Sequence, residues 1–308
     1  MPPSHIERLE LARCALEGLS VGDAFGQCLF LPPPIIERIL EARKLPGPPW
    51  YFTDDTNMAL SIFYSLRKFA GIDQDRLARS FADHYELSRG YGMAMRSLLP
   101  ALRQGASWRT LAPSLFGRQG SYGNGGAMRA APVGAYFADD LDAIVEHARR
   151  SAEVTHTHPE AVAGTIAVAV AAALAWRQRG TDPHTTRAHF ITQVLPLVPA
   201  SKVRDGLLRA RDIPAGTSAE NAVAVLGNGS RVTAQDTVPF ALWCAGEQLG
   251  SYHEALWLTA SGQGDIDTTC AIVGGIVVLS AGVESIPAQW RDYREALPAW
   301  PFEDSPSL

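Results

Sequence analysis

The stretch GQGDIDTTCAIVGGI, residues 262–276, places two aspartates and two threonines directly before a run of apolar residues. The apolar pattern continues to residue 282 and covers nearly all faces of a helix, as is typical of a helix inside a bundle. Neighbouring helices could approach it closely at its small residues, Gly274, Gly275, Ser280 and Ala281. Two carboxylates at the start of a buried helix are unexpected, because a solvated loop could hold them at no energetic cost.

Helical periodicity extends over almost the whole chain. It predicts amphipathic helices over 73–87 and 139–154, with Asp139 as the cap of the second, and nearly all-apolar helices over 158–176 and 237–249. VAVLG (223–227) is one weak strand candidate, and no sheet is predicted from it. The proline-rich pieces 31–36 and 44–52 are expected to be loops. The sequence therefore predicts an all-α fold, a single compact multi-helix domain over residues 1–308.

The composition limits the classes of function. Charged residues make up only 19% of the 308 residues, which suits a compact body with a large core. The net charge of −5 and the lack of a Lys/Arg run argue against nucleic-acid binding. No signal peptide is predicted, and the longest apolar run, 161–176, is too short to span a membrane. The four dispersed cysteines form no CxxC pair and are expected to be reduced thiols, which favours a cytoplasmic location.

A second acidic cluster lies far upstream. Thr53-Asp54-Asp55-Thr56 follows an aromatic and proline-rich segment and precedes a helical pattern. Thr53 or Asp54 could simply cap this helix, and Asp265 could do the same for the helix that follows it. Two aspartates at each of two helix starts, however, are more acid than capping requires.

The charge argument depends on whether the two clusters meet. Two carboxylates about 4 Å apart repel by roughly 4 kcal/mol at an effective dielectric constant of about 20. If Asp54, Asp55, Asp265 and Asp267 converge, they could not all stay ionised without cations, and two divalent ions would balance their charge. Oxygen ligands supplemented by threonine hydroxyls select a hard ion, Mg²⁺ or Mn²⁺. Calcium binding by an EF-hand loop is excluded, because Cys270 and Ile276 replace the required glycine and glutamate.

Two further patterns could bind a ligand. RQGSYGNGGAMRAAPVG (118–134) has glycines whose exposed backbone amides could hold phosphate oxygens, although a plain surface turn is the alternative. It matches neither a Walker loop nor a Rossmann fingerprint. His156 and His158 form an HxH pair that could bind a metal or serve the core. We expect His156 to contact the substrate and His158 to be structural.

Four segments together resemble the ADP-ribosylglycohydrolase family, which includes dinitrogenase reductase-activating glycohydrolase. They are GLSVGDAFGQ (18–27), TDDTNM (53–58), GSYGNGGAMRAAP (120–132) with THTHPEAVAG (155–164), and GQGDIDTTCAIVGG (262–275). The resemblance covers about residues 18–282. It implies an all-α fold with a central dinuclear metal cleft, and removal of ADP-ribose from modified proteins, commonly from arginine and in some branches from serine.

The resemblance also assigns residues. It implies that two Mg²⁺ or Mn²⁺ ions are held by Thr53, Asp54, Asp55, Asp265, Asp267 and Thr268. It implies that the diphosphate and flanking ribose contact Gly120, Ser121, Tyr122, Gly123 and Asn124, with His156 nearby. The segment SRGYGMAMR (88–96) could also line the cleft. Asp55 or Asp267 is expected to accept a proton from the attacking water, while the metals orient the ribose and lower the pKa of that water.

One departure from the family pattern concerns the acid/base group. Many members have a glutamate four residues after the second glycine of GDxxG, where this chain has Phe30. Glu37 or Glu41 could replace it, but no spacing requires this. Besides a hydrolase acting on ADP-ribosyl-arginine proteins, two alternatives therefore stay open. One is a catalytically impaired ADP-ribose-binding protein. The other is an immunity-type protein that also docks on an ADP-ribosyltransferase.

Overall fold

The contact between α1, His5–Gln27, and α15, Ile266–Ala281, organises the structure. The computed structural model describes residues 2–180 and 186–303, so the extreme ends of the predicted domain lie outside the described residues. Three glycines of α1 spaced four apart form its contact face. A Cβ atom added to any of them would collide with a backbone carbonyl oxygen of α15. On Gly18 it would lie 2.4 Å from the oxygen of Gly274, on Gly22 2.2 Å from that of Cys270, and on Gly26 2.5 Å from that of Ile266. The register therefore runs antiparallel, and the end of α1 meets the start of α15.

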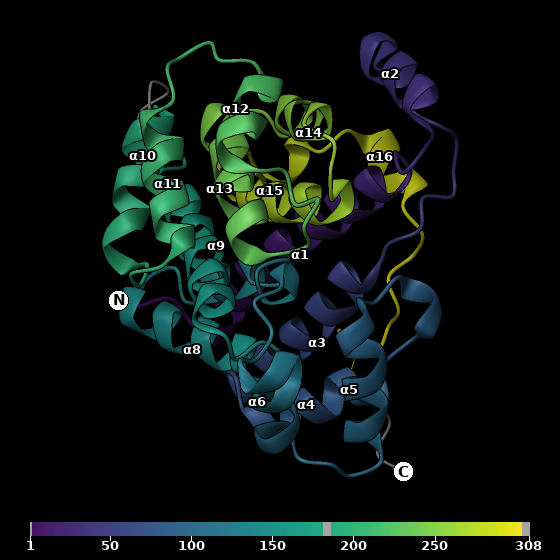
Figure 1. Cartoon of the computed structure of the whole chain (residues 1–308), viewed down its shortest axis with the longest axis vertical. Helices are drawn as coiled ribbons and strands as arrows, with labels where there is room; N and C mark the ends of the chain where they lie inside the picture. Colours follow the sequence, from purple (N-terminus) through teal and green to yellow (C-terminus); the bar gives the residue numbers. More distant parts are fainter. Residues whose placement is uncertain (1, 181–185, 304–308) are drawn as a thin grey trace.

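The described residues form helices and connecting segments, with no β-strand (Figure 1). The helices before the middle of the chain are α2 Pro33–Ala42, α3 Asp54–Phe69, α4 Gln74–Asp83, α5 Met93–Arg103, α6 Trp108–Arg118, α7 Ala131–Tyr136, α8 Leu141–Glu153 and α9 Pro159–Arg177. The later ones are α10 Arg187–Val194, α11 Lys202–Asp212, α12 Ala219–Leu226, α13 Ala234–Glu247, α14 Tyr252–Ser261 and α16 Ala288–Tyr293. Short 3₁₀ turns are η1 Leu87–Arg89, η2 Asn124–Gly126, η3 Leu195–Leu197 and η4 Val283–Ser285. The predicted all-α class is confirmed.

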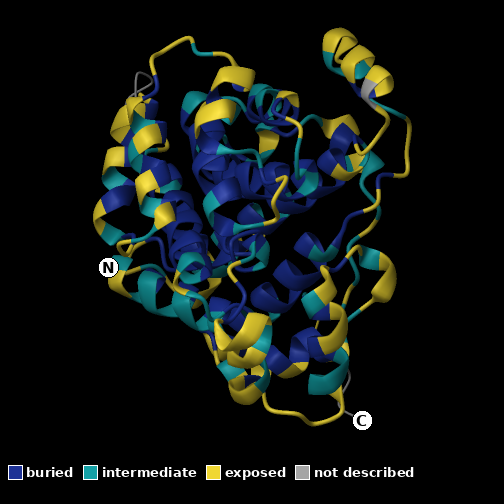
Figure 2. Cartoon of the chain, in the orientation of Figure 1, coloured by how far each residue is buried: buried dark blue, intermediate teal, exposed yellow. Residues whose placement is uncertain are grey.

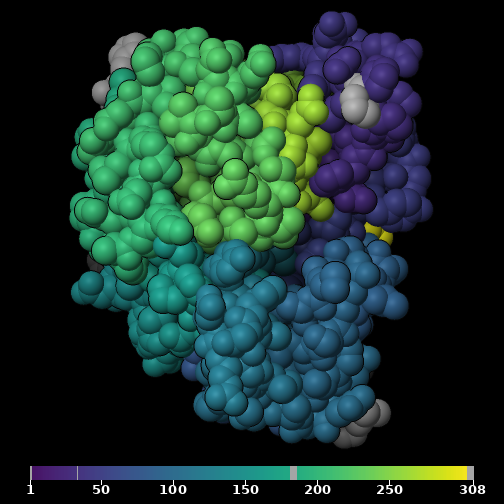
Figure 3. Space-filling view, viewed as in Figure 1, coloured from purple at the N-terminus to yellow at the C-terminus, as the bar shows by residue number. Residues whose placement is uncertain are grey.

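The core is built around α15, which contacts α1, α9, α13 and α14. These central helices are mostly buried, whereas α2 projects from the body and is largely exposed (Figure 2). In the space-filling view, purple N-terminal residues lie beside yellow-green residues from the C-terminal part of the chain (Figure 3). Helices from the N-terminal and C-terminal parts of the chain are thus neighbours, as the convergence of the acidic clusters requires.

Helix α9 is an interior helix. By length and composition it is the one described helix that could cross a membrane, but 78% of its apolar window is buried inside the protein. Small residues allow this burial: a Cβ atom at Gly134 of α7 would lie 1.9 Å from the Ala169 carbonyl oxygen of α9. The hydrophobic character of α9 is therefore explained by packing against other helices.

Several predicted boundaries are corrected by the structure. Asp140, not Asp139, caps α8, because Asp140 Oδ1 accepts a hydrogen bond from Ala143 N at 3.0 Å while Asp139 pairs with Arg8 at 2.6 Å. VAVLG (223–227) is helical over most of its length, within α12. Residues 31–36 are only partly a loop, because α2 begins at Pro33, where proline at the first turn is compatible with a helix.

Candidate functional site

The two acidic clusters are brought together through Asp23 of α1. Asp23 is fully buried and lies on α1 between Gly22 and Gly26, two of the glycines that contact α15. Its carboxylate accepts hydrogen bonds from the backbone N–H and the hydroxyl of Thr53 at 2.9 and 2.8 Å. It also accepts from the backbone N–H of Thr56 at 3.0 Å and from the Thr56 hydroxyl. Asp23 thus fixes the first turn of α3 beside the start of α15.

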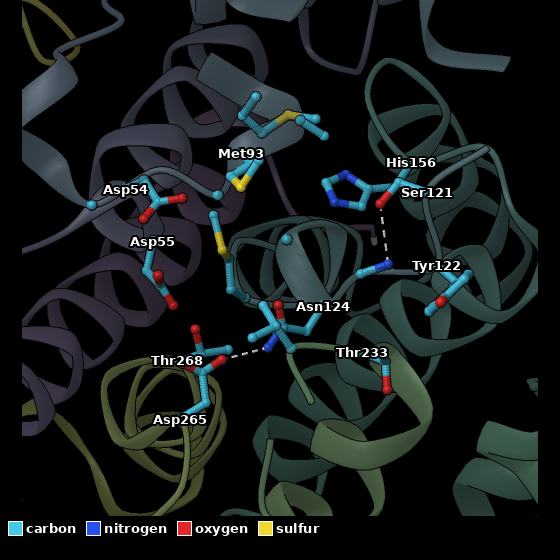
Figure 4. Close-up of a pocket in the computed structure, with 18 of the residues that line it drawn as sticks. Asp54, Asp55, Met93, Ser121, Tyr122, Asn124, His156, Thr233, Asp265 and Thr268 are labelled. Atoms are coloured by element: carbon cyan, nitrogen blue, oxygen red, sulfur yellow. Dashed lines mark hydrogen bonds between the residues drawn. The ribbon is translucent and has the colours of Figure 1, made fainter. Parts of the chain in front are cut away.

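One cavity of about 460 Å³ collects most of the predicted site residues (Figure 4). We call one side of it the acid wall, made of Asp54, Asp55, Asp265, Asp267 and Thr268. The opposite side, the loop wall, is made of Ser121, Tyr122, Gly123, Asn124 and His156. Asn124 Nδ2 joins the two walls by donating to Asp265 Oδ2 at 2.7 Å. The structure therefore brings together clusters separated by about 210 positions in the sequence.

Two predicted site residues do not line this cavity. Thr53 is the N-cap of α3, and its hydroxyl donates to Asp23 and accepts from Asp55 N, so that it lies behind the acid wall. Gly120 is buried behind the loop wall, where a Cβ atom would lie 2.1 Å from Thr157 Oγ1. The capping interpretation of Thr53 is confirmed, and its role as a metal ligand stays a prediction.

The carboxylates of the acid wall are held in an unfavourable environment. Burial, and next the charge of Asp23, raise the pKa of Asp54 to about 7. Burial and the charges of Asp23 and Asp267 raise the pKa of Asp55 well above its ordinary value. Burial and the charge of Asp265 do the same to the pKa of Asp267. Desolvation and mutual repulsion thus disfavour the ionised forms together.

These residues fit a bound cation. Asp55 Oδ1 is buried and has no hydrogen-bond partner among the described residues, while the Thr53 hydroxyl donates to the other oxygen, Asp55 Oδ2, at 3.1 Å. A hard divalent ion would supply the missing partner and offset the repulsion. Among residues 2–180 and 186–303, however, no three His, Cys, Asp or Glu side chains lie close enough to form a ready-made metal site. The acidic groups face one cavity, and the number and identity of the ions stay a prediction.

The loop wall is made by a glycine-rich turn held against a second loop. The Ser121 hydroxyl accepts from Gly123 N at 3.2 Å. An isolated β-bridge joins Gly123 to Thr233, and Ala234 N donates to the Tyr122 carbonyl oxygen at 3.0 Å. His158 caps α9 by accepting from Glu160 N at 3.1 Å, so its predicted structural role is confirmed.

His156 lies deeper in the loop wall and differs from His158 in its surroundings. Only 5% of its surface is exposed. Burial, and next the charge of Arg129, lower the pKa of His156 to about 3. The imidazole is therefore neutral at physiological pH, which suits a hydrogen-bonding partner of a ligand.

Three residues of the site were not identified from the sequence. Asp23 does not line the cavity but supports the acid wall, and its burial could have been suspected from its place on an apolar helix. Arg231 and Thr233 line the cavity, although nothing in the surrounding sequence marks them. The segment 88–96 does contribute, through Gly90 and Gly92 to Met95.

The residues considered as replacements for the missing glutamate lie elsewhere. Phe30 follows α1, is 49% exposed and does not line the cavity. Glu37 and Glu41 are exposed on α2 and do not line it either. In this structure the carboxylates that face the cavity all belong to the acid wall.

The comparisons with known proteins agree with this geometry. The family model described as ADP-ribosylglycohydrolase matches residues 4–302. Human ADP-ribosylhydrolase ARH3 is 28% identical over 83% of this chain and 80% of its own length. ADP-ribosylarginine hydrolase Tri1 of Pseudomonas putida is 26% identical over 92% of this chain and 74% of its own.

A solved structure shares the fold. It is titled an ADP-ribosylglycohydrolase-related protein complex, and it superposes with a TM-score of 0.61 over 94% of both chains at 24% identity. At that identity the similarity shows only that the two chains share the arrangement of helices.

Proposed function

Because the chain belongs to the ADP-ribosylglycohydrolase family and is a glycohydrolase, we propose that it releases ADP-ribose from modified protein side chains, with ADP-ribosyl-arginine as the preferred linkage. The observation that carries this proposal is the cavity, in which the acid wall faces a glycine-rich loop. The loop wall offers backbone amides and hydroxyls to a diphosphate, and the acid wall offers oxygen ligands beside the ribose.

The hydrogen-bonding groups of the cavity suit an arginine-linked substrate. Four carboxylates line it, against a single arginine and a neutral histidine among the described residues. A guanidinium brings several N–H donors to these oxygens, whereas a serine side chain linked through its oxygen brings none. The P. putida relative is named as an ADP-ribosylarginine hydrolase, which agrees with this preference.

The leaving group provides a second reason. Cleavage of a serine linkage expels an alkoxide, which requires a proton from a general acid. The guanidinium of ADP-ribosyl-arginine is already protonated and can depart as neutral guanidine. Because no glutamate occupies position 30 and Phe30 lies outside the cavity, the cleft suits the linkage that requires no acid.

We assign the catalytic roles within the acid wall. Bound Mg²⁺ or Mn²⁺, held by Asp54, Asp55, Asp265, Asp267 and Thr268, would orient the ribose hydroxyls and make water a better nucleophile. Asp55 or Asp267, as an ionised carboxylate beside the bound ions, accepts the proton of the attacking water.

The alternative interpretations fare less well. The absence of the glutamate at position 30 suggested a catalytically impaired binding protein. Phe30, however, does not line the cavity, and the relatives are named as hydrolases. Docking on an ADP-ribosyltransferase has no support in the relatives' names. We also propose a cytoplasmic location, supported by four cysteines that form no disulfide.

The proposal is tested with two peptides, one ADP-ribosylated on arginine and one on serine. Released ADP-ribose is quantified by mass spectrometry with Mg²⁺ and with a chelator. We expect release from the arginine peptide with Mg²⁺ only, and its loss in Asp54→Ala. The matched control is Asp83→Ala, which removes an exposed carboxylate outside the cleft.

Each outcome bears on one part of the proposal. Faster release from the serine peptide would overturn the linkage. Full activity of Asp54→Ala, or activity unaffected by the chelator, would overturn the metal assignment. No release from either peptide, in protein shown to be folded, would overturn the proposed activity.

A further inference from the structure

A buried arginine lies behind the loop wall without a carboxylate partner. Arg129 is fully buried, and no ion pair to it is found among the described residues. Its Nη2 donates to the Ser151 carbonyl oxygen and to Thr155 Oγ1, both at 2.8 Å. Its guanidinium lies 4.5 Å from the centroid of the Phe81 ring. A guanidinium has donors and no acceptor, so each contact fixes the role of its partner.

The Thr155 hydroxyl transmits this constraint to His156. Its oxygen accepts from Arg129, which leaves its own proton to donate. The one acceptor that the described structure places within reach is His156 Nδ1, at 2.7 Å. Nδ1 must then be unprotonated, and the proton of the neutral ring resides on Nε2. The reverse arrangement would leave the buried hydroxyl proton without an acceptor, which is unfavourable.

The Nε2 edge of His156 faces the glycine loop. A Cβ atom at Gly125 would lie 2.9 Å from Nε2, and one at Gly123 would lie 3.2 Å from it, so glycine keeps this edge open. Within residues 2–180 and 186–303, no hydrogen-bond acceptor for Nε2–H is found. His156 and Ser121 lie next to each other at the cavity in Figure 4. An oxygen atom of a bound ligand is therefore the natural acceptor.

We propose that Arg129 and Thr155 are positioning residues that hold His156 as a neutral Nε2–H donor to an oxygen of the ADP-ribose moiety. The identity of the ligand rests on the proposed function, whereas the tautomer does not. The low pKa of His156 agrees with it, because the charge of Arg129 opposes protonation of the ring. The arrangement supplies a donor whose direction is fixed before the ligand binds.

The tautomer can be observed directly. In ligand-free protein labelled with ¹⁵N-histidine, long-range ¹H–¹⁵N spectra separate protonated from unprotonated ring nitrogens, and the spectrum of His156→Gln assigns the resonances. We expect protonated Nε2 and unprotonated Nδ1 at pH 7. A protonated Nδ1 would overturn the proposal whether or not the protein hydrolyses ADP-ribosyl-arginine.

Variants then test the function of the relay. Thr155→Val keeps the shape of the side chain and removes its hydroxyl, and we expect ADP-ribose to bind about fivefold more weakly, with a shifted Nδ1 resonance. Thr155→Ser, which keeps the hydroxyl, should have the ADP-ribose affinity and the Nδ1 resonance of the wild type. Thr259→Val is the matched control, because it removes a buried hydroxyl that donates within α14. Unchanged affinity and unchanged Nδ1 resonance in Thr155→Val would overturn the proposal.

A second inference concerns the loop that carries Arg231. Asn124 N donates to the Val232 carbonyl oxygen at 3.3 Å, so this loop lies directly beside the glycine-rich loop. Its own turn is fixed by Arg231 N, which donates to Asp236 Oδ2 at 3.0 Å. The side chain of Arg231 is 82% exposed and lies 3.9 Å from Asp236, a loose pairing. The backbone is held, while the guanidinium can still turn toward a ligand.

Arg231 is the one lysine or arginine among the described residues that line the cavity. A diphosphate brings two negative charges toward a cleft that already holds four carboxylates. We infer that Arg231 binds the diphosphate and makes the site selective for a nucleoside diphosphate over an uncharged nucleoside.

Binding measurements test this inference with ADP-ribose, ADP and adenosine. In Arg231→Ala we expect about tenfold weaker binding of ADP-ribose and ADP, and adenosine affinity within about twofold of the wild type. The affinities of Arg231→Lys should lie between those of the wild type and Arg231→Ala. Arg38→Ala, which removes an exposed arginine of α2 outside the cavity, should behave as the wild type. Equal losses for all three ligands, or none, would overturn the inference while leaving the proposed hydrolysis to the peptide assay.

Discussion

In the acid wall and in the loop wall of the cleft, burial shifts the pKa values of the titratable side chains in opposite directions. In the acid wall, burial and mutual repulsion raise the pKa of Asp54 to about 7 and that of Asp55 well above its ordinary value. In the loop wall, burial and the charge of Arg129 lower the pKa of His156 to about 3. The carboxylates of the acid wall thus need a cation to stay ionised together, whereas His156 of the loop wall is stable as a neutral ring. The acid wall is suited to cations, and the loop wall to the polar oxygens of a ligand.

The walls also differ in how they are built. The loop wall comes largely from one stretch of chain, between Ser121 and His156. The acid wall exists only because α1 and α15 touch through glycines and Asp23 holds the first turn of α3. A local change can therefore alter the loop wall, while the acid wall depends on packing across the whole molecule.

The largest effect is expected from a change that separates the parts of the acid wall without altering a carboxylate. In Gly22→Val the added atoms collide with the Cys270 carbonyl oxygen, since even a Cβ atom would lie 2.2 Å from it. We expect a loss of more than about 4 kcal/mol in the free energy of unfolding, measured by chemical denaturation. Gly47→Ala, at a glycine with open space around it, should change little. Equal stability of the two variants would contradict the proposed packing.

A smaller but still large effect is expected within the acid wall itself. Asp55→Asn keeps the shape of the side chain and removes one charge and one candidate base, so kcat/KM should fall about a thousandfold. Mg²⁺ should raise the melting temperature of the wild type and not that of this variant. Without metal, the variant should be at least as stable as the wild type, because one source of repulsion is gone.

The loop wall offers the contrasting variant for the same assays. Ser121→Ala should weaken ADP-ribose binding and keep the stabilisation by Mg²⁺, since Ser121 lies across the cavity from the carboxylates. If Asp55→Asn also kept that stabilisation, the division of roles between the walls would be wrong.

Much of this arrangement could be predicted from the sequence because its signals are local. The all-apolar pattern of α9 and α15 and the acidic residues at the starts of α3 and α15 are each visible in a short window. The segment order then linked them to one family. The boundaries that were missed, such as the cap Asp140 in place of Asp139, turn on a tertiary contact, the pairing of Asp139 with Arg8.

Other features could not be predicted because they depend on distant partners. Asp23 is one aspartate in an apolar helix, and only the fold shows that it receives the N–H groups and hydroxyls of Thr53 and Thr56. Thr53 caps α3 and donates to Asp23, 30 positions earlier in the chain, while its expected role as a metal ligand stays a prediction. Arg231 reaches the cavity through pairing of two loops that are far apart in the sequence.

An effect of intermediate size is expected for the pH dependence of stability, to which His156 of the loop wall contributes. The unfolded state binds a proton to His156 near its ordinary pKa, and the folded state only near pH 3, so the wild type loses stability as the pH falls below about 6.5. His156→Asn lacks this loss. Between pH 7 and pH 5 we expect the stability of the wild type to drop by about 2 kcal/mol relative to the variant, measured by urea denaturation. If the difference in the free energy of unfolding between the wild type and His156→Asn did not change with pH, the pKa of His156 would be the same in the folded and unfolded states.

The smallest effect is expected at the position where many family members have a glutamate. Phe30 is 49% exposed and lies outside both walls, so Phe30→Ala should change kcat/KM for the arginine peptide by less than about twofold. The reason is that departure of neutral guanidine requires no acid, and both candidate bases lie in the acid wall. A loss of activity comparable to that of Asp55→Asn would mean that the segment after α1 reaches the substrate during catalysis. The chemistry would then not be confined to the two walls.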